Sequence, residues 1–489
     1  MLWLILLLLV LAVVAYDLSQ RRHAILRNFP VIGHFRYWLE AIGPELRQYI
    51  VTSNDEERPF SRDQRAWIYT SAKGKNNYFG FGTDNDLERA EDYPLFSHSP
   101  FPLDDLHPGV EGYDPKFALP CTKVLGEARG RRHAFRPASV VNVAAMSYGS
   151  LSAPAVSALN QGVAIAGALH NTGEGGISPH HKQGGELVYQ LGTGYFGARA
   201  ADGSFDLARF MDTLAAAPMV RAIEVKLSQG AKPGIGGILP AAKITPEIAA
   251  IRGIPMGQDC ISPSHHRAFS DVDGLLEFVE TLADASGLPI GIKSAVGETA
   301  FWDELGRRMA ATGTGPDFVT IDGGEGGTGA APLAFADHVS LPILHALPRA
   351  LRPLEEHGVR DDLVVAASGR LGLPGRGLLA FGLGADVIQV AREAMIAIGC
   401  IQAQRCHSGH CPTGVATQNR WLMRGLDPTD KAARLANYLV TMRKELLRLS
   451  RACGHDHPSK VPLERMEVLS GSRGLRPAGE VYRGLAVEV

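Results

Sequence analysis

The sequence contains little cysteine, few aromatic residues and no excess of charge of either sign. Cysteine occurs 6 times in 489 residues, which is too few for a small disulfide-stabilised scaffold. Lysine and arginine total 49 against 51 aspartates and glutamates, so there is no basic footprint for nucleic acid. The chain is 45% hydrophobic and 20% charged, which excludes a disordered chain and a polytopic membrane protein. Glycine, in contrast, is abundant with 55 residues, and glycine allows backbone to approach a ligand closely.

Long hydrophobic runs are also scarce, and the sequence has one, at Leu2–Tyr16. As a helix it spans about 22 Å, less than the ~30 Å hydrocarbon core of a bilayer. A signal peptide is the alternative, but no basic residue precedes the run and its cleavage site is weak. We therefore expect residues 1–19 to form an uncleaved, single-pass anchor in the inner (cytoplasmic) membrane. Arg21, Arg22 and Arg27 follow the run, and the positive-inside rule then predicts a catalytic domain in the cytoplasm.

The rest of the chain predicts a barrel preceded by an extension. Residues 20–134 contain few periodic runs and are interpreted as an irregular N-terminal extension that packs on the barrel. From residue 135 to 430, short β-rich runs alternate with helical patterns such as Asp271–Ala285 and Phe301–Ala311. The expected strands are Val140–Ala145, Ala168–Asn171, Ala222–Leu227, Met256–Ile261, Pro289–Lys293, Phe318–Asp322, Leu363–Ala367 and Asp386–Val390. Eight strands, most followed by a helix, predict an α/β fold of the (β/α)8 TIM barrel type.

A doubly wound open sheet is the alternative fold. Its dinucleotide-binding fingerprint is expected directly after the first strand. The segment Met146–Ser150 in that place lacks the required glycine spacing. The barrel is therefore preferred.

Three expected strands end in glycine-rich runs that contain charged residues. These runs are Asn171–Gly176, Gln229–Gly237 and Asp322–Gly329. Flexible connecting loops are the plain alternative. In a barrel all three would emerge at the C-terminal face, where active sites lie, so we expect them to form a ligand site.

The C-terminal segment 431–489 begins with an amphipathic helical pattern. One face carries Leu435, Leu439, Met442, Leu446 and Leu449. Basic residues occupy the rest, at Arg434, Arg443, Lys444 and Arg448. We expect the apolar face to pack on the core.

A cysteine set within residues 400–411 predicts a metal centre. Cys400, Cys406 and Cys411 are followed by Pro412, and three thiolates this close suit a soft metal. The spacing favours an iron–sulfur cluster, while structural zinc with His407 or His410 as a fourth ligand stays open at this point. The other cysteines, Cys121, Cys260 and Cys453, are isolated and are expected to be ordinary buried or loop thiols.

The last two expected strands end in residues suited to a phosphate. Gly369 and Arg370 follow one strand, and Ala391 and Arg392 follow the next. In barrels the corresponding loops bind a mononucleotide phosphate. A flavin phosphate and a sugar phosphate suit these residues equally well.

Over residues 135–450 the chain resembles the FMN-binding synthase domain of glutamate synthase large subunits. The resemblance is carried, in the same order, by Met146–Ser152, Asn171–Gly176, Lys226–Lys243, Ile261–His266, Gly326–Pro332 and Cys400–Gln418. It implies a (β/α)8 barrel with FMN at its mouth and a [3Fe-4S] cluster on Cys400, Cys406 and Cys411. The resemblance thus decides against zinc.

The resemblance also implies a reaction and the residues that perform it. In the family, 2-oxoglutarate and ammonia give 2-iminoglutarate, which reduced FMN converts to glutamate. Lys226, Lys232 and Arg252 match the basic positions around substrate and flavin, and Glu174 matches the active-site glutamate. The residues expected to line FMN are Met146, Ser147, Gln229, Lys232, Gly324, Gly326, Gly327, Gly369, Arg370, Ala391 and Arg392. His265 and His266 are expected to be structural.

Two departures from the family pattern leave the acid substrate open. Ile238 replaces the amide of the family's GEGGQLP motif, and the loop 322–329 lacks a histidine found in the usual SGHDGGTG. A related FMN oxidoreductase acting on another small 2-oxo or amino acid is therefore the alternative. The non-catalytic alternative is an electron relay that is anchored in the membrane and contains flavin and an iron–sulfur cluster.

The sequence also bears on partners. It shows no N-terminal cysteine nucleophile of the glutamine amidotransferase type, so we expect free ammonia, an amine or ammonia from a partner as nitrogen source. An NAD(P)-binding domain is not apparent, so ferredoxin or a flavoprotein subunit is the expected electron donor. Nucleic acid is not an expected partner.

Overall fold

The computed structural model describes all residues except 21–23, 48–55, 79, 81, 84, 88, 89, 472, 473 and 485–489. The expected basic residues Arg21 and Arg22 lie outside the described residues. The chain divides into two units, Met1–Arg65 and Ala66–Val489. Each is described by itself below.

The first unit contains α1 (Leu2–Ser19), α2 (Ala24–Asn28) and α3 (Ile32–Leu46). Within the described residues, α1 is the one helix long and apolar enough to cross a membrane. Its leucine side chains are exposed, whereas Asp17 near its end is fully buried. The Asp17 carboxylate accepts a hydrogen bond from the Val31 amide at 2.9 Å and lies 2.8 Å from Nε2 of His34.

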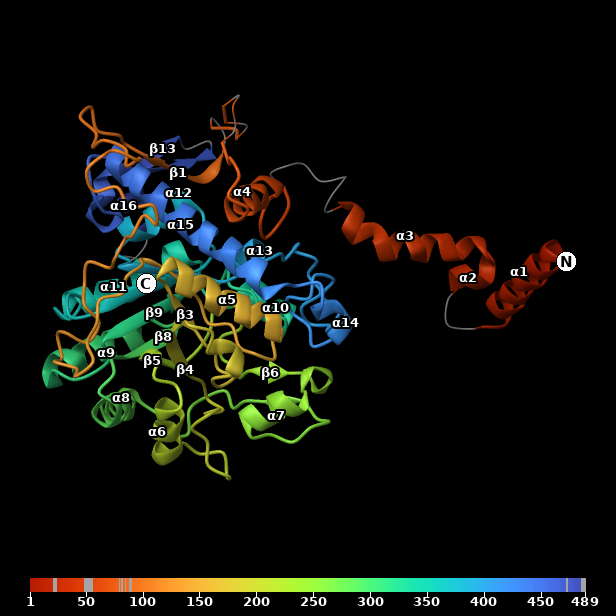
Figure 1. Ribbon diagram of the computed structural model, residues 1–489, viewed down its shortest axis with the longest axis horizontal. Coiled ribbons are helices and arrows are strands. Elements are labelled where there is room, and N and C mark those ends of the chain that lie inside the picture. The colour runs from red at the N-terminus through yellow and green to blue at the C-terminus, as the bar shows by residue number, and fades with distance from the viewer. Residues whose placement is uncertain are drawn as a thin grey trace. The chain divides into compact units, whose positions relative to one another are not determined.

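The second unit is built on a closed barrel of eight parallel strands (Figure 1). In chain order these are β2 (Val141–Val143), β3 (Leu169–Asn171), β4 (Glu186–Leu191), β5 (Val220–Lys226), β8 (Ile290–Ser294), β9 (Phe318–Asp322), β10 (Val364–Ser368) and β11 (Val387–Val390). The barrel closes where β11 pairs with β2, Ile388 opposite Val141. This confirms the predicted fold and excludes the doubly wound sheet.

One predicted barrel strand is wrong and one real strand went unpredicted. Met256–Ile261 is not in the barrel, because only Cys260–Ile261 forms a strand, β7, which pairs antiparallel with β6 (Ile238–Leu239). This two-stranded ribbon belongs to a long excursion between β5 and β8 that also contains α7 (Pro246–Arg252). The place in the barrel is taken by β4, which pairs with β3 and β5.

Helices surround the barrel strands (Figure 1). They are α5 (Ala153–Ala166), α6 (Leu207–Ala215), α8 (Val272–Ser286), α9 (Ala300–Thr312), α10 (Leu333–His338), α11 (Ile343–Glu356), α12 (Pro374–Gly382), α13 (Arg392–Ala397), α14 (Arg420–Met423) and α15 (Pro428–Ala452). The helical patterns predicted at 271–285 and 301–311 correspond to α8 and α9. Asp271 begins α8 with a side-chain cap, accepting from the Gly274 amide at 2.8 Å.

The apolar face of α15 packs on the barrel unit as predicted. Leu435, Leu439, Met442 and Leu446 are buried, and α15 runs alongside α5 (Figure 1). Arg443, one of the basic residues outside that face, is also buried and only 1% exposed. Its guanidinium donates to the carbonyls of Ala166 at 2.9 Å and Lys116 at 2.7 Å. These bonds satisfy a carbonyl at the end of α5, which explains why a cation is tolerated there.

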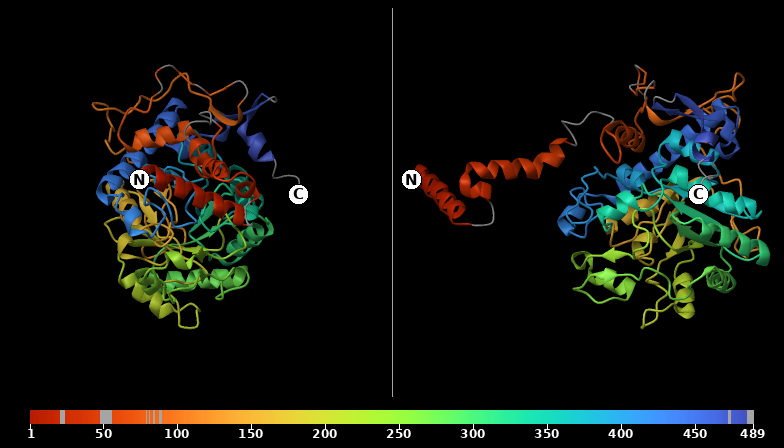
Figure 2. Two further views of the ribbon diagram at one scale, coloured as in Figure 1. Left: turned by 90° about the vertical axis from the view of Figure 1, so that its right-hand side faces the viewer. Right: turned by 180° about the vertical axis from the view of Figure 1, so that it is seen from behind.

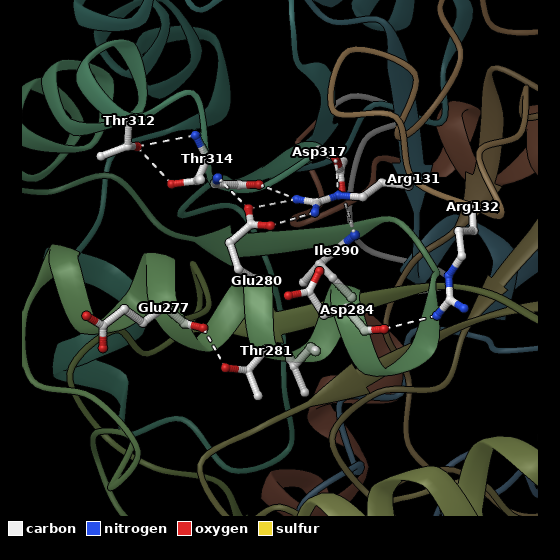
Figure 3. Close-up of polar contacts among 12 residues, drawn as sticks. Arg131, Arg132, Glu277, Glu280, Thr281, Asp284, Ile290, Thr312, Thr314 and Asp317 are labelled. Atoms are coloured by element: carbon white, nitrogen blue, oxygen red, sulfur yellow. Dashed lines mark hydrogen bonds and ion pairs between the residues drawn. The ribbon is translucent and has the colours of Figure 1, made fainter.

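The segment before the barrel closes its floor. Leu125 and Phe135 pair in a small antiparallel bridge and join the core inside the barrel with Leu169, Val188 and Phe318. The turn between them carries Arg131, whose guanidinium bonds Glu280 of α8 and Asp317 before β9 (Figure 3). The extension, expected to be irregular, therefore ends in an ordered plug.

A small sheet covers another side of the barrel unit. It joins β1 (Glu91–Phe96) to β12 (Met466–Ser470) and β13 (Leu475–Pro477), with α16 (Ala478–Tyr482) following. Both views in Figure 2 show the early and late segments side by side here. The helix α4 (Arg62–Ala72) ends in this unit, where Tyr69 donates to the carbonyl of Cys400 at 2.7 Å.

Candidate active site at the carboxyl ends of the barrel strands

The three glycine-rich runs follow β3, β5 and β9, so all three emerge at the carboxyl ends of the strands. Two of them touch through backbone. A Cβ on Gly230 would overlap the carbonyl of Gly323, so this crossing requires glycine. The Gly230 amide also donates to the Asp322 carboxylate at 3.0 Å. The runs thus form one continuous rim.

An ion pair between Glu174 and Lys226 lies at the centre of this rim. Lys226 Nζ is 2.7 Å from Glu174 Oε1 and donates to Gln229 Oε1 at 2.5 Å. A Cβ on Gly192 or on Gly237 would come within 2.6 or 2.7 Å of the Glu174 carboxylate oxygens. The carboxylate therefore lies between two glycines, a cradle in which a larger residue would displace it from its present position. Burial raises the pKa of Glu174, but Lys226, Lys232 and Arg252 outweigh that effect and lower it, so the group is ionised at neutral pH.

Two further predicted cations lie around this pair. Lys232 is 2% exposed and donates to the carbonyl of Gly236. Burial and the charge of Lys226 lower the pKa of Lys232. Arg252, at the end of α7, is buried and donates to the carbonyl of Tyr148 at 3.1 Å, with its guanidinium 5.1 Å from the Phe196 ring centre. The structure thus brings all four predicted catalytic residues into one electrostatically coupled group.

Sequence reasoning missed a second buried layer just below this group. Lys293 of β8 lies 3.4 Å from Asp322, and both are buried. Burial lowers the pKa of Lys293, but Asp322 and Glu224 outweigh it and raise the pKa. Glu224 accepts from Asn171, Gln190 and Thr320 at 2.6 to 2.7 Å. Charged residues at the ends of predicted strands were the available signal.

The predicted phosphate-binding residues lie beyond β10 and β11. Arg370 has a positive φ of 53° directly after Gly369, whose φ is 148°. Burial together with Arg376 and Arg392 lowers the pKa of Arg370 to about 10. Arg376 bonds the Glu325 carboxylate at 2.9 Å, and Arg392 donates to the Glu325 carbonyl. Three guanidinium groups thus gather near Glu325 and Glu393, and a cluster of arginines of this kind suits a dianionic phosphate.

The remaining predicted flavin-lining residues border the rim. A Cβ on Gly173 would lie 2.6 Å from the Ser147 amide nitrogen, and one on Gly327 would lie 3.2 Å from Arg392. Ser147 Oγ is 2.9 Å from Ser150 Oγ, and the adjacent Met146 is buried. Gly324 and Gly326 lie within the β9 loop, and Ala391 precedes α13. These glycines are therefore packed closely against neighbouring segments of the same rim.

The three cysteines of residues 400–411 are free thiols beside the rim. Burial and the charges of Cys406 and Cys411 raise the pKa of Cys400 to about 12, so the thiols influence one another. A Cβ on Gly329 would lie 2.9 Å from the backbone of Cys406, and Lys243 Nζ donates to the Cys406 carbonyl at 2.6 Å. Among the described residues, no three His, Cys, Asp or Glu side chains are arranged as a metal site. The donor chemistry, three neighbouring soft thiols, fits an iron–sulfur group.

The residue Ile238, a departure noted in the sequence, lies at the outer edge of this site. It follows Gly237 of the Glu174 cradle and pairs with Ile261 of β7. The two side chains are 38% and 70% exposed. The ribbon therefore presents apolar surface next to the charged group.

The two histidines of the excursion differ. His265 is exposed, whereas His266 is buried, with Nε2 2.9 Å from the Lys226 carbonyl and its ring stacked on Phe269. His266 therefore supports the strand end that carries Lys226. Burial lowers the pKa of His266.

Taken with the fold, these residues define a (β/α)8 barrel with a cluster of buried charged groups at the carboxyl ends of its strands. A family model described as the conserved region in glutamate synthase matches residues 127–456. The chain belongs to the glutamate synthase family and is an oxidoreductase of the type that acts on CH–NH2 donors.

Relatives are similar over different shares of their length. The glutamate synthase large subunit-like protein YerD of Bacillus subtilis is 39% identical, covering 90% of this chain and 89% of the relative. A glutamate synthase large subunit-like protein of Rhizobium meliloti is 32% identical, covering 79% and 86%. The archaeal glutamate synthase [NADPH] of Methanocaldococcus jannaschii is 36% identical, covering 68% of this chain but 61% of that enzyme. Among solved structures, a mandelate oxidase overlays with a TM-score of 0.43 at 14% identity, covering 83% and 90%.

Proposed function

We propose that the protein is a glutamate synthase-like oxidoreductase that depends on FMN and a [3Fe-4S] cluster. It would reduce the 2-imino acid formed from 2-oxoglutarate and ammonia, or an amine, to glutamate. The observation that supports this most directly is the Glu174–Lys226 pair in its glycine cradle, with Lys232 and Arg252 beside it. That arrangement holds fixed cations for a dicarboxylate and one carboxylate for a developing cation.

FMN, when bound, supplies the hydride for the imine carbon. Arg370 and Arg392 would hold its phosphate, because they are partly buried cations at the ends of neighbouring barrel strands. Gly324, Gly326 and Gly327 would accommodate the ring by backbone approach. Lys232 would lie beside the N1/C2 carbonyl side of the ring, where a positive charge favours the reduced anion.

The protein side chains would then bind and orient the acid. Lys226 and Arg252 would bind its carboxylates, Arg252 in a bidentate manner. Ammonia would add to the 2-oxo carbon and water would leave, and the resulting imine would take a proton from solvent to give an iminium with N–H donors. Ionised Glu174 would accept one of these hydrogen bonds and so stabilise the cation until hydride reaches its carbon.

The direct test is a single-turnover experiment. The holoenzyme is reduced anaerobically and mixed with 2-oxoglutarate and ammonium, and glutamate and the flavin absorbance are followed together. We expect flavin reoxidation with one glutamate formed per flavin. Reduced enzyme that no 2-oxo acid reoxidises would instead favour the electron-relay alternative.

The phosphate assignment predicts a loss of FMN affinity on removal of one guanidinium. Arg370→Gln should weaken FMN binding about tenfold or more, since a charged hydrogen bond contributes roughly 1.5–3 kcal/mol. Equilibrium dialysis of FMN against the apoprotein measures it. Arg352→Gln is the control, because Arg352 forms an ion pair with Glu356 on the exposed side of α11. Equal affinities in both variants would contradict the assignment.

The cluster assignment predicts a loss of iron. Cys411→Ser should remove most of the iron and acid-labile sulfide, since one of three thiolate ligands is lost. Cys453→Ser is the matched control, because Cys453 is also buried but lies at the end of α15. Iron and sulfide analysis with electron paramagnetic resonance checks both. Unchanged iron in the Cys411 variant would contradict a cluster at this site.

A second candidate substrate class is favoured by the apolar ribbon. Ile238 and Ile261 are exposed beside the Glu174 cradle. Apolar side chains there offer no polar contact that would select an acid with a second carboxylate over one without it. A 2-oxo acid with an apolar side chain would suit it. Comparing reoxidation rates for 2-oxoglutarate and branched 2-oxo acids, in the natural chain and in Ile238→Gln, distinguishes the two.

We also propose that α1 anchors the protein in the inner membrane, with the barrel in the cytoplasm. The support is an exposed apolar helix of 18 residues, about 27 Å long. Ferredoxin or a flavoprotein subunit would supply electrons there. Flotation of the full chain with lipid vesicles tests the anchor, and reduction by ferredoxin tests the donor.

A further inference from the structure

The helix α3 has an apolar side that no described residue of its own unit covers. Its apolar side chains recur every three or four residues and so lie along one side of the helix. They are Ile32, Phe35, Trp38, Leu39 and Leu46, exposed by 77%, 59%, 56%, 41% and 37%. The Phe35 and Trp38 rings lie 5.7 Å apart on this side. The Arg36–Glu40 ion pair, at 2.9 Å, flanks this side.

The start of α3 is tied to the end of α1. Asp17, two residues before the last residue of α1, is fully buried. Its carboxylate bonds the Val31 amide at 2.9 Å and contacts His34 at 2.8 Å. The first turn of α3 therefore lies at the same surface as Asp17.

The two observations together restrict how α3 can lie. A charged group such as Asp17 is expected at the edge of the hydrocarbon core rather than inside it. A helix of 15 residues is about 22 Å long, so α3 pointing away from the membrane would leave Leu46 and Leu39 in water. Lying flat, it buries the whole apolar side from Ile32 to Leu46 in the boundary region. Amphipathic helices with Trp and Phe on the apolar side adopt that position.

We propose that α3 lies in the lipid–water boundary of the membrane that α1 crosses, with a lipid surface as the occupant of its apolar side. This inference rests on the proposed anchoring by α1. The chain would then contact the membrane through a spanning helix and a surface helix joined by Asp17 and His34.

Trp38 is a natural probe of this arrangement. The full chain is reconstituted into phosphatidylcholine–phosphatidylglycerol vesicles in a Trp3→Phe background, which removes the tryptophan of α1. Vesicles containing lipids brominated near the headgroup end of the acyl chain quench tryptophan in the boundary region. Subtracting the signal of Trp3→Phe/Trp38→Phe isolates Trp38. We expect this signal to fall at least about twofold in the brominated vesicles.

A matched control moves the probe to another side of α3. In Trp3→Phe/Tyr37→Trp/Trp38→Phe, the tryptophan is displaced by one residue, about 100° around the helix, and we expect little quenching. If the tryptophans at both positions are quenched equally, the placement of α3 is overturned. It is also overturned if neither is quenched while the chain still floats with the vesicles. Both outcomes leave the anchor intact. A full chain that does not float would overturn the anchor and the placement of α3 together.

Discussion

Replacing Glu174 by glutamine is expected to reduce glutamate formation about 100-fold or more, in line with the usual contribution of a placed acid–base group. The substitution preserves shape but removes the charge that faces Lys226 at 2.7 Å. An iminium would then meet a neutral amide in place of a carboxylate. Turnover of the FMN-loaded variant with 2-oxoglutarate and ammonium measures the effect.

The control for this experiment is Glu186→Gln. Glu186 also pairs with a cation, Arg221 at 2.8 Å, but it is half-exposed. It lies at the first residue of β4, away from the carboxyl ends of the strands. The control should keep its turnover and FMN content. A Glu174→Gln enzyme within twofold of the natural one would show that the carboxylate does not take part in the reaction.

Replacing Arg131 by methionine is expected to lower the free energy of unfolding of the barrel unit by about 3 kcal/mol, as for other broken buried ion pairs. Arg131 bonds Glu280 at 2.6 and 2.8 Å and Asp317 at 3.1 Å (Figure 3). Asp317 is 2% exposed, so the variant leaves a buried carboxylate without its cation. Urea unfolding followed by fluorescence measures the change.

The effect of Arg131→Met should depend on pH. Burial raises the pKa of Asp317 even though Arg131 opposes it, so without Arg131 the pKa rises further and acid neutralises the unpaired carboxylate. For Glu280, burial raises the pKa, but the bond to Arg131 outweighs it and lowers the pKa. The natural protein therefore loses that stabilisation as pH falls through the folded-state pKa. The Asp317 effect shrinks the difference between the proteins as pH falls from 8 to 5, whereas the Glu280 effect sets in only at lower pH, below the ordinary pKa of that carboxyl.

Arg132→Met is the matched control for this experiment. Arg132 is the next residue, is exposed and donates to the Asp284 carbonyl at 3.0 Å (Figure 3). It should change stability by less than about 0.5 kcal/mol. An equal loss of unfolding free energy in both variants would mean that the stability depends on the turn and not on the buried ion pair.

The barrel was predictable from the sequence because its strands are short, buried runs followed by distinctive loops. Glycine runs after β3, β5 and β9 indicated the face of the site, since glycine has a local conformational signature. The wrong prediction of a barrel strand at residues 256–261 has a physical cause. A short apolar run does not distinguish a barrel strand from a ribbon in an excursion, whereas β4 begins with the exposed Glu186 and follows a polar loop.

The contacts that build the site were predictable only in part. Glu174 and Lys226 came from motifs, but their 2.7 Å pairing depends on how β3 and β5 are placed around β4. Lys293 and Asp322 each end a predicted strand, but nothing local in the sequence shows that the two side chains pair across neighbouring strands. The burial of Arg443 was not predictable, because helical periodicity places side chains around an axis but does not show which backbone carbonyls need donors.

The excursion between β5 and β8 separates the charged cluster into two parts. Lys232, Ile238 and Arg252 all lie on it, while Lys226 and Lys293 lie on barrel strands. Two of the cluster's cations are thus placed by an inserted segment and not by the barrel wall. Altering that segment can change the charge and shape of the cluster's outer edge without rebuilding the cylinder of strands.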